Sequence, residues 1–347
     1  MSISAASVVA EVESLREAHA LAFRIAFAVA VGLTLGHVLG WDFPFLPPLF
    51  AVQLLTGSQS LNVKQAIGFV VLMMAGCVLG ILIAQAFVET PAVLILVIGL
   101  IIFFAFLMLA RAQAVPVANV LLITVSIVPL VAVSSIEIAY GLVYTLIAGS
   151  ILAVVLVFLA YAFFPARGQT NVAAPPAEER FPVSAALANA AVLMSFVMLF
   201  VFSGSPVSVI MIMTAITLLR QPAVAGHGAA SGFIMGNVVG GLAATAAYLL
   251  VAWFPSPAFL LLVVLLFGLF FGAKIAESTN RAPIYVVGLV TFLIVLGIGL
   301  APLPSDSGTV FVSRVFNVVI AAAYTIGVAS VLRWLLRVQE DQHRAAL

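Results

Sequence analysis

Residues 91–110 read PAVLILVIGLIIFFAFLMLA, twenty consecutive positions without a charged or strongly polar side chain. A helix of that length rises about 30 Å, which matches the hydrocarbon core of a bilayer. Similar runs recur along the whole chain of 347 residues, which is 65% hydrophobic and only 7% charged. So few polar side chains cannot cover a water-facing surface. The composition therefore excludes a soluble globular protein and predicts an all-α polytopic membrane protein.

Counting these runs predicts about twelve membrane-spanning helices in two sets of six. The first set covers residues 20–40, 44–60, 65–88, 91–110, 114–134 and 138–164. The second set covers residues 184–202, 205–220, 228–253, 257–274, 283–301 and 312–334.

The basic residues predict the orientation of the chain. With the N-terminus in the cytoplasm, only Arg314 of the 13 Lys and Arg residues lies on the outer side. The inner side then holds Arg16, Arg24, Lys64, Arg111, Arg167, Arg180, Arg220, Lys274, Arg281, Arg333, Arg337 and Arg344. By the positive-inside rule, both termini are cytoplasmic. Arg24 is expected near the inner interface, because it lies 18 residues, about 27 Å of helix, before Asp42.

The polar segments predict the division of the chain. We expect an N-terminal cytoplasmic or interfacial segment (1–19), a first membrane half (20–164), a cytoplasmic linker (165–183), a second membrane half (184–336) and a cytoplasmic tail (337–347). Residues 1–19 contain Glu11, Glu13 and Glu17, which a cleavable signal peptide would not carry. They form either an amphipathic helix on the inner surface or an extension of the first span.

Two segments suggest an internal repeat. PFLPPLFAVQLLTGSQS (44–60) and SPVSVIMIMTAITLLRQ (205–221) align at an offset of 161, which places Gln53 on Thr214 and Thr56 on Thr217. The glycines that follow also correspond, with Gly76 and Gly80 matching Gly236 and Gly240. Six spans thus match six in the same orientation, which predicts a parallel repeat about an axis along the membrane normal.

The two aligned spans are also the predicted transport site. Both are short and begin at proline, and short or proline-interrupted spans at matching places in two halves indicate a binding site. The candidate pathway residues are Gln53, Thr56, Thr214, Thr217 and Asn237. The alternative is that these side chains only form hydrogen bonds with neighbouring helices.

Charged groups are expected at both ends of the pathway. Lys64, Arg220 and His227 at the inner mouth are candidates for capturing an anion, although topology alone also explains Lys64 and Arg220. His37, Asp42, Asp306 and Arg314 at the outer end are candidates for handling protons, although a lone histidine near an interface is more often structural.

Two further features concern packing. Pro129 interrupts the span 114–134 beside Thr124 and Ser126, whose hydroxyls are expected to satisfy the carbonyl that proline frees. Glycines at four-residue spacing, such as Gly268 and Gly272, permit close helix contacts within the bundle or between the subunits of a homo-oligomer.

The chain offers little for catalysis. The lone Cys77 excludes an intrachain disulfide and a cysteine-based metal cluster, and no glycine-rich phosphate loop with lysine is present. We therefore expect no enzyme, no cofactor, no bound metal and no nucleic-acid partner.

Two stretches resemble one known family. FPFLPPLFAVQLLTGSQSLNVKQAIGFVVLMMAGCVLG (43–80) and SPVSVIMIMTAITLLRQPAVAGHGAASGFIMGNVVGG (205–241) are similar to the fusaric acid resistance and aromatic acid exporter (FUSC-like) superfamily. In that family a proline-led short span precedes a polar loop, a basic residue and a glycine-rich span. Lys64 matches the basic residue in the first half, and His227 matches it approximately in the second.

The resemblance implies an exporter of aromatic carboxylates in the bacterial inner membrane, working with a periplasmic adaptor protein and an outer-membrane channel. The chain departs from fuller members because only the linker at 165–182 stands where they carry a large soluble domain. The major facilitator superfamily is a poor match, because GSQSLNVKQA (57–66) lacks its loop motif. Two alternatives stay open: a passive anion channel and a membrane scaffold that transports nothing.

Overall fold

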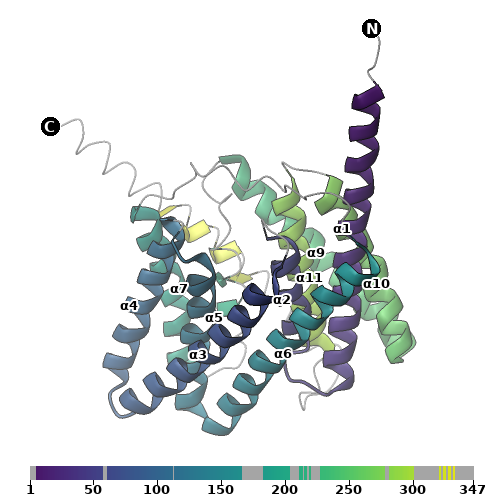
Figure 1. Cartoon of the computed structure of the whole chain (residues 1–347). Helices are drawn as coiled ribbons and strands as arrows, with labels where there is room; N and C mark the ends of the chain where they lie inside the picture. The colour runs from purple at the N-terminus through teal and green to yellow at the C-terminus, as the bar shows by residue number, and fades with distance from the viewer. Residues whose placement is uncertain are drawn as a thin grey trace, which may run out of the picture. The chain divides into compact units, whose positions relative to one another are not determined.

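The structure, a computed structural model, describes residues 5–57, 61–111, 113–165, 183–203, 227–277 and 281–300, with parts of 211–219 and 320–332. Every regular element in these residues is a helix. The helices are α1 (Ala5–Val38), α2 (Leu46–Leu55), α3 (Val63–Phe87), α4 (Pro91–Ala110), α5 (Val115–Ser134), α6 (Ile136–Phe163), α7 (Val183–Ser203), α9 (His227–Trp253), α10 (Pro257–Glu277) and α11 (Ala282–Leu300) (Figure 1).

The structure agrees with a multi-pass membrane protein. Within the described residues, nine helices are long and apolar enough to cross a bilayer, all except α2. Each corresponds to a span predicted from the sequence. The predicted spans 205–220 and 312–334 lie largely outside the described residues.

The predicted second span, 44–60, requires a correction. Helix α2 has only ten residues, so it rises about 15 Å, half the thickness of the hydrocarbon core. It begins with prolines in its first turn and is capped at Thr56, whose backbone N–H still bonds to Val52 O. The predicted span was too long because it also included the polar residues 56–60, TGSQS, which follow the helix.

Helix α1 resolves the two alternatives for the N-terminal segment. It is continuous from Ala5 to Val38, so residues 5–19 extend the first span (Figure 1). Gly40 ends the helix with a φ of 68°, while Trp41 N–H bonds to Gly36 O and Gly40 N–H bonds to His37 O. This Schellman motif favours glycine, because its C′ residue adopts the left-handed region.

The chain divides into two compact units. Unit 1 comprises Met1–Ile67, Ala148–Ala174 and Val239–Leu303, and unit 2 comprises Gly68–Ile147, Pro175–Val238 and Pro304–Leu347. Each unit therefore combines segments from both predicted halves, and three of the five boundaries fall within α3, α6 and α9. The predicted division at the linker stays a prediction.

Unit 1 is built on close contact between α1 and α10. A methyl group on Gly268 would lie 3.0 Å from Ala26 Cα, and one on Gly272 would lie 2.8 Å from Ala22 O. Both alanines are buried. Small residues on both helices let the backbones approach, which favours association in lipid, where the hydrophobic effect between helices is absent.

Unit 2 contains a comparable contact between α3 and α5. A methyl group on Gly76 would lie 2.7 Å from Thr124 Oγ1, and one on Gly80 would lie 2.9 Å from Val128 Cβ. The predicted role of the hydroxyls beside Pro129 is wrong. Thr124 Oγ1 donates to Val120 O at 2.9 Å, and the buried Ser126 Oγ has no hydrogen-bond partner.

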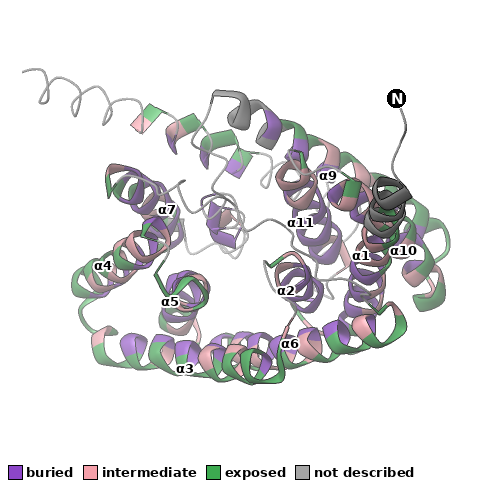
Figure 2. Ribbon diagram, turned by 45° about the horizontal axis from the view of Figure 1, so that its top comes forward, coloured by how far each residue is buried: buried purple, intermediate pink, exposed green. Residues whose placement is uncertain are grey.

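The opposite face of α3 is open. Val71, Met74, Val78 and Leu82 recur at helical spacing and are all exposed. Figure 2 shows this contrast, since α3 carries much green while α2 is largely purple. A continuous apolar exposed face on a helix of 25 residues is what contact with lipid chains requires.

Candidate functional site

The proline-rich start of α2 is held by glycines of other helices in unit 1. A methyl group on Gly36 of α1 would lie 2.9 Å from Pro44 Cα, and one on Gly297 of α11 would lie 2.7 Å from Phe45 Cβ. Any side chain at these two glycines would displace the segment that leads into α2.

Two further glycines complete this contact. A methyl group on Gly32 of α1 would lie 3.2 Å from Pro48 Cδ, and one on Gly149 of α6 would lie 3.6 Å from Pro47 Cδ. Eight of the ten residues of α2 are buried as a result. The sequence PFLPP thus acts as a rigid wedge between α1, α6 and α11, since proline fixes its own backbone.

The polar residues of α2 lie at its other end. Gln53 and Thr56 are half-buried, and Thr56 Oγ1 donates to Val52 O at 2.8 Å. The Thr56 hydroxyl therefore satisfies its own helix and can only accept a further hydrogen bond. Because α2 rises about 15 Å, the helix itself covers only half the thickness of a hydrocarbon core.

A buried arginine is the strongest feature that the sequence analysis missed. Arg24 of α1 is 1% exposed and is among the largest fully buried side chains of the described residues. Its Nε donates to Phe164 O at 2.7 Å, and its guanidinium carbon lies 4.4 Å from the centroid of the Tyr161 ring. Its Nη2 is buried without a hydrogen-bond partner.

This position carries a sequence signal that the span count obscured. Arg24 interrupts the apolar run AHALAFRIAFAVAV (18–31), and an ionisable residue inside a span is a functional candidate by default. It lies fourteen residues before the end of α1, about 21 Å of helix. The number of residues between Arg24 and Asp42 predicted that Arg24 lies near the inner membrane interface. In the structure, packing against the end of α6 buries its side chain.

The other predicted site residues are distributed between the units. Lys64 is exposed in the first turn of α3, and Asn237 is buried on the part of α9 that belongs to unit 2. His227 is the first residue of α9. Thr214, Thr217, Arg220, Asp306 and Arg314 lie outside the described residues.

At the outer end, His37 and Asp42 have different surroundings. His37 Nδ1 lies 3.1 Å from Leu300 O, so this nitrogen carries the proton and joins the end of α1 to the end of α11. Asp42 is exposed. The structure therefore gives His37 a structural contact between α1 and α11.

Comparison with known proteins gives one match. A family model described as "Protein of unknown function (DUF2955)" matches residues 21–160, which lie within the predicted first membrane half. No curated protein and no solved structure matches the chain. The chain is therefore similar to this family from α1 to α6, a similarity that assigns no activity.

Proposed function

We propose that the protein is a secondary transporter of the bacterial inner membrane that exports small amphipathic anions, chiefly aromatic carboxylates. The observation that carries this proposal is helix α2. It is too short to cross the bilayer, it starts at prolines, and its sides are buried while Gln53 and Thr56 stand at its end. Discontinuous helices of this kind build the substrate sites of secondary transporters.

The proposal includes twelve membrane segments, with the short α2 counted as one of them, arranged as a parallel repeat with both termini in the cytoplasm. Two helix contacts support the repeat, since Gly80 meets Val128 and Gly240 meets Gly288, with 160 residues between the members of each corresponding pair. The distribution of basic residues supports the orientation.

Energetics favour export of an anion. Each negative charge that leaves a cell with a negative interior gains about 2.3 kcal/mol per 100 mV of membrane potential. Transport therefore needs no carboxylate relay at the bilayer centre. Passage beyond the periplasm would use the adaptor protein and outer-membrane channel that the family resemblance implies.

Reporter fusions test the orientation. Fusions after residues 62, 112 and 172 should report the cytoplasm, and fusions after 42, 89 and 255 should report the periplasm. The fusion after residue 62 is the most informative, because α2 alone does not span the membrane. A periplasmic signal at residue 62 or 172 would overturn the twelve-span topology.

Flux into proteoliposomes tests the transport site. Gln53→Leu should reduce benzoate transport at least tenfold without loss of folded protein, because it removes the amide from the end of α2. Gln85→Leu is the matched control, since Gln85 is an exposed residue of α3. Equal transport by both variants would place the pathway elsewhere.

The same preparation separates the three classes of function. Saturable flux that responds to a pH gradient supports an exporter. Large single-channel currents that do not saturate would indicate a channel instead. If no organic anion is transported, the remaining interpretation is a membrane scaffold that transports nothing.

A further inference from the structure

The guanidinium of Arg24 is only partly used within unit 1. Nε donates a hydrogen bond to the carbonyl oxygen of Phe164, which directly follows the last residue of α6. The guanidinium also makes a cation–π contact with the ring of Tyr161. Arg24 therefore caps α6, where a positive charge is favourable. The cap leaves Nη2 without an acceptor, although the atom is buried.

The charge of Arg24 is also without a close carboxylate. The ion pair between Lys274 and Glu277 of α10 does not involve Arg24. Tyr161 interacts with Arg24 electrostatically and through a side-chain hydrogen bond, and Glu17, seven residues earlier on the same helix, interacts with it electrostatically. A buried guanidinium with a free donor and no adjacent carboxylate is unfavourable unless an anion joins it.

Aromatic rings from α1 and the end of α6 pack together next to Arg24 and the residues that it contacts in sequence. Phe23 stacks on Phe164 with ring centroids 5.5 Å apart, and Phe27 meets Phe163 edge-on at 5.5 Å. We call these four rings and Tyr161 the aromatic cluster. Phe23 and Phe163 are 45% and 63% exposed, so one side of the cluster faces the surface of unit 1.

The cluster lies at the depth where α2 ends. Gly32 of α1 contacts Pro48 of α2, and the two helices pack together. Counting from this contact, Arg24 and Thr56 both lie eight residues, about 12 Å, further toward the inner side, because α1 and α2 run in opposite directions. The polar end of α2 and the guanidinium thus lie on the same side of the contact between Gly32 and Pro48.

We propose that Arg24 is the carboxylate-binding residue of unit 1. Nη2 donates to the carboxylate of an aromatic acid, while the acid's ring packs on the aromatic cluster through offset and edge-on contacts. The acid reaches the cluster from its exposed side, which Phe23 and Phe163 form. This inference rests on the proposed function for its ligand class, and it assigns the binding to a residue outside the predicted anion-capture set.

Binding to the purified full-length protein tests the proposal directly. Benzoate should raise the thermal unfolding midpoint of the wild type saturably, whereas benzyl alcohol, which has the same ring without the charge, should not. Arg24→Lys should need about tenfold more benzoate, a loss of about 1.4 kcal/mol, because lysine lacks the planar fork and stacks less well on Tyr161. Arg24→Met should lose the benzoate response entirely.

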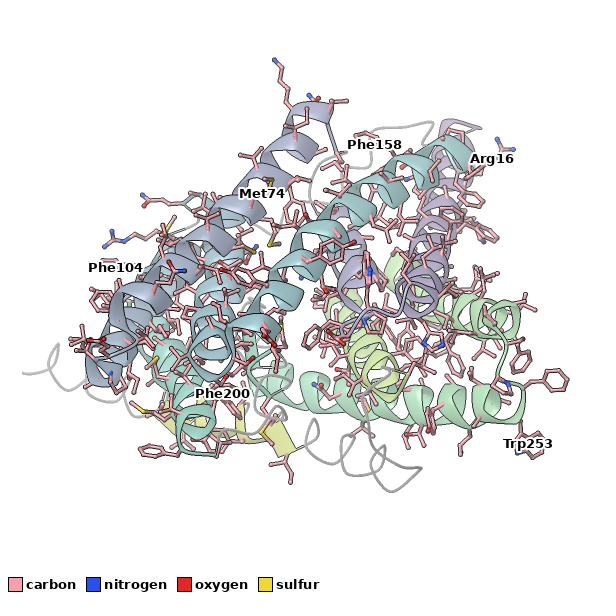
Figure 3. All side chains as sticks on the ribbon, turned by 90° about the horizontal axis from the view of Figure 1, so that it is seen from below. Arg16, Met74, Phe104, Phe158, Phe200 and Trp253 are labelled. Atoms are coloured by element: carbon pink, nitrogen blue, oxygen red, sulfur yellow. The ribbon has the colours of Figure 1, made fainter. Side chains whose placement is uncertain are left out.

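The control is Arg16→Met, which removes the same charge from an exposed position on the same helix (Figure 3). It should respond to benzoate as the wild type does. If Arg24→Met does not fold, the benzoate response of Arg24→Lys tests the proposal instead. An unchanged half-saturating benzoate concentration in Arg24→Lys, or no benzoate response in the wild type, would overturn the proposal.

Flux measurements distinguish this failure from failure of the proposed function. If Arg24→Lys transports benzoate with the wild-type KM, the protein is a transporter whose binding residue lies elsewhere. If the wild type binds benzoate through Arg24 but moves no anion, the site stands and the transport function fails.

Discussion

Two helix contacts occupy corresponding places in the chain and are made differently. In unit 2, Gly80 of α3 faces Val128 of α5, and a methyl group on Gly80 would lie 2.9 Å from Val128 Cβ. In unit 1, Gly240 of α9 faces Gly288 of α11, and a methyl group on Gly240 would overlap the Gly288 carbonyl oxygen and lie 3.0 Å from its Cα. Both residues of the second contact are 160 positions after those of the first.

The difference shows how the second residue of a contact sets the distance between two backbones. The two contacts lie 160 residues apart, as the predicted repeat requires, but the distance between backbones changes with the residue at the second position. Valine holds α3 and α5 apart by the size of its side chain, and glycine lets α9 meet α11 backbone to backbone. A side chain can move or be shortened, whereas a backbone carbonyl can move only with its helix.

Gly240→Ala should have the largest effect. The new methyl group would meet backbone, so we expect a loss of about 3 kcal/mol of unfolding free energy, at the upper end for overpacking. The measurement is unfolding in mixed detergent micelles. Gly241→Ala is the matched control, because nothing lies within 4 Å of a methyl group there. It should stabilise by about 0.5–1 kcal/mol, as alanine does in a helix. Equal stability of the two variants would contradict the close contact with Gly288.

Gly80→Ala should have a smaller effect that can be reversed. We expect a loss of about 2 kcal/mol, because Val128 must shift to make room. In the double variant with Val128→Ala, a double-mutant cycle should show a favourable coupling of about 1 kcal/mol. Gly68→Ala, whose methyl group would meet no atom within 4 Å, serves as the control. Additive effects of the two substitutions would mean that Gly80 and Val128 do not touch.

Ser126→Ala should have the smallest effect and the opposite sign. Ser126 Oγ is buried without a hydrogen-bond partner, so its removal should stabilise the protein by up to about 1 kcal/mol. Thr124→Val removes a hydroxyl that does bond, to Val120 O at 2.9 Å, and should destabilise slightly. A larger loss for Ser126→Ala than for Thr124→Val would show that Ser126 has a partner in the membrane.

The apolar runs predicted most of the helices because only a few kinds of secondary structure can cross a bilayer. A helix that satisfies its own backbone and spans about 30 Å leaves little freedom in length. For that reason the predicted 91–110 and 257–274 correspond closely to α4 and α10, which the structure gives as Pro91–Ala110 and Pro257–Glu277. The same argument failed for 44–60, because apolar composition also suits a short helix buried among others.

The candidate site was only partly predictable. Proline and polar spacing singled out α2 as an unusual helix, while the role of Gln53 and Thr56 in a pathway stays a prediction. The sequence also placed Arg24 on the first span. Its burial follows from the approach of Tyr161 and Phe164, which lie more than 130 residues later in the chain. Counting residues along the sequence cannot predict a contact between residues so far apart in the chain.

The sequence by itself determined that this protein is helical and crosses a membrane several times, because its composition leaves no alternative in water. Only the tertiary structure showed that α2 ends after ten residues and that its proline-rich start packs against four glycines of α1, α6 and α11. It also decided that one arginine is enclosed with an unused donor. The physical reason is that lipid selects elements by length and polarity, whereas helix contacts depend on which small residues meet across the bundle.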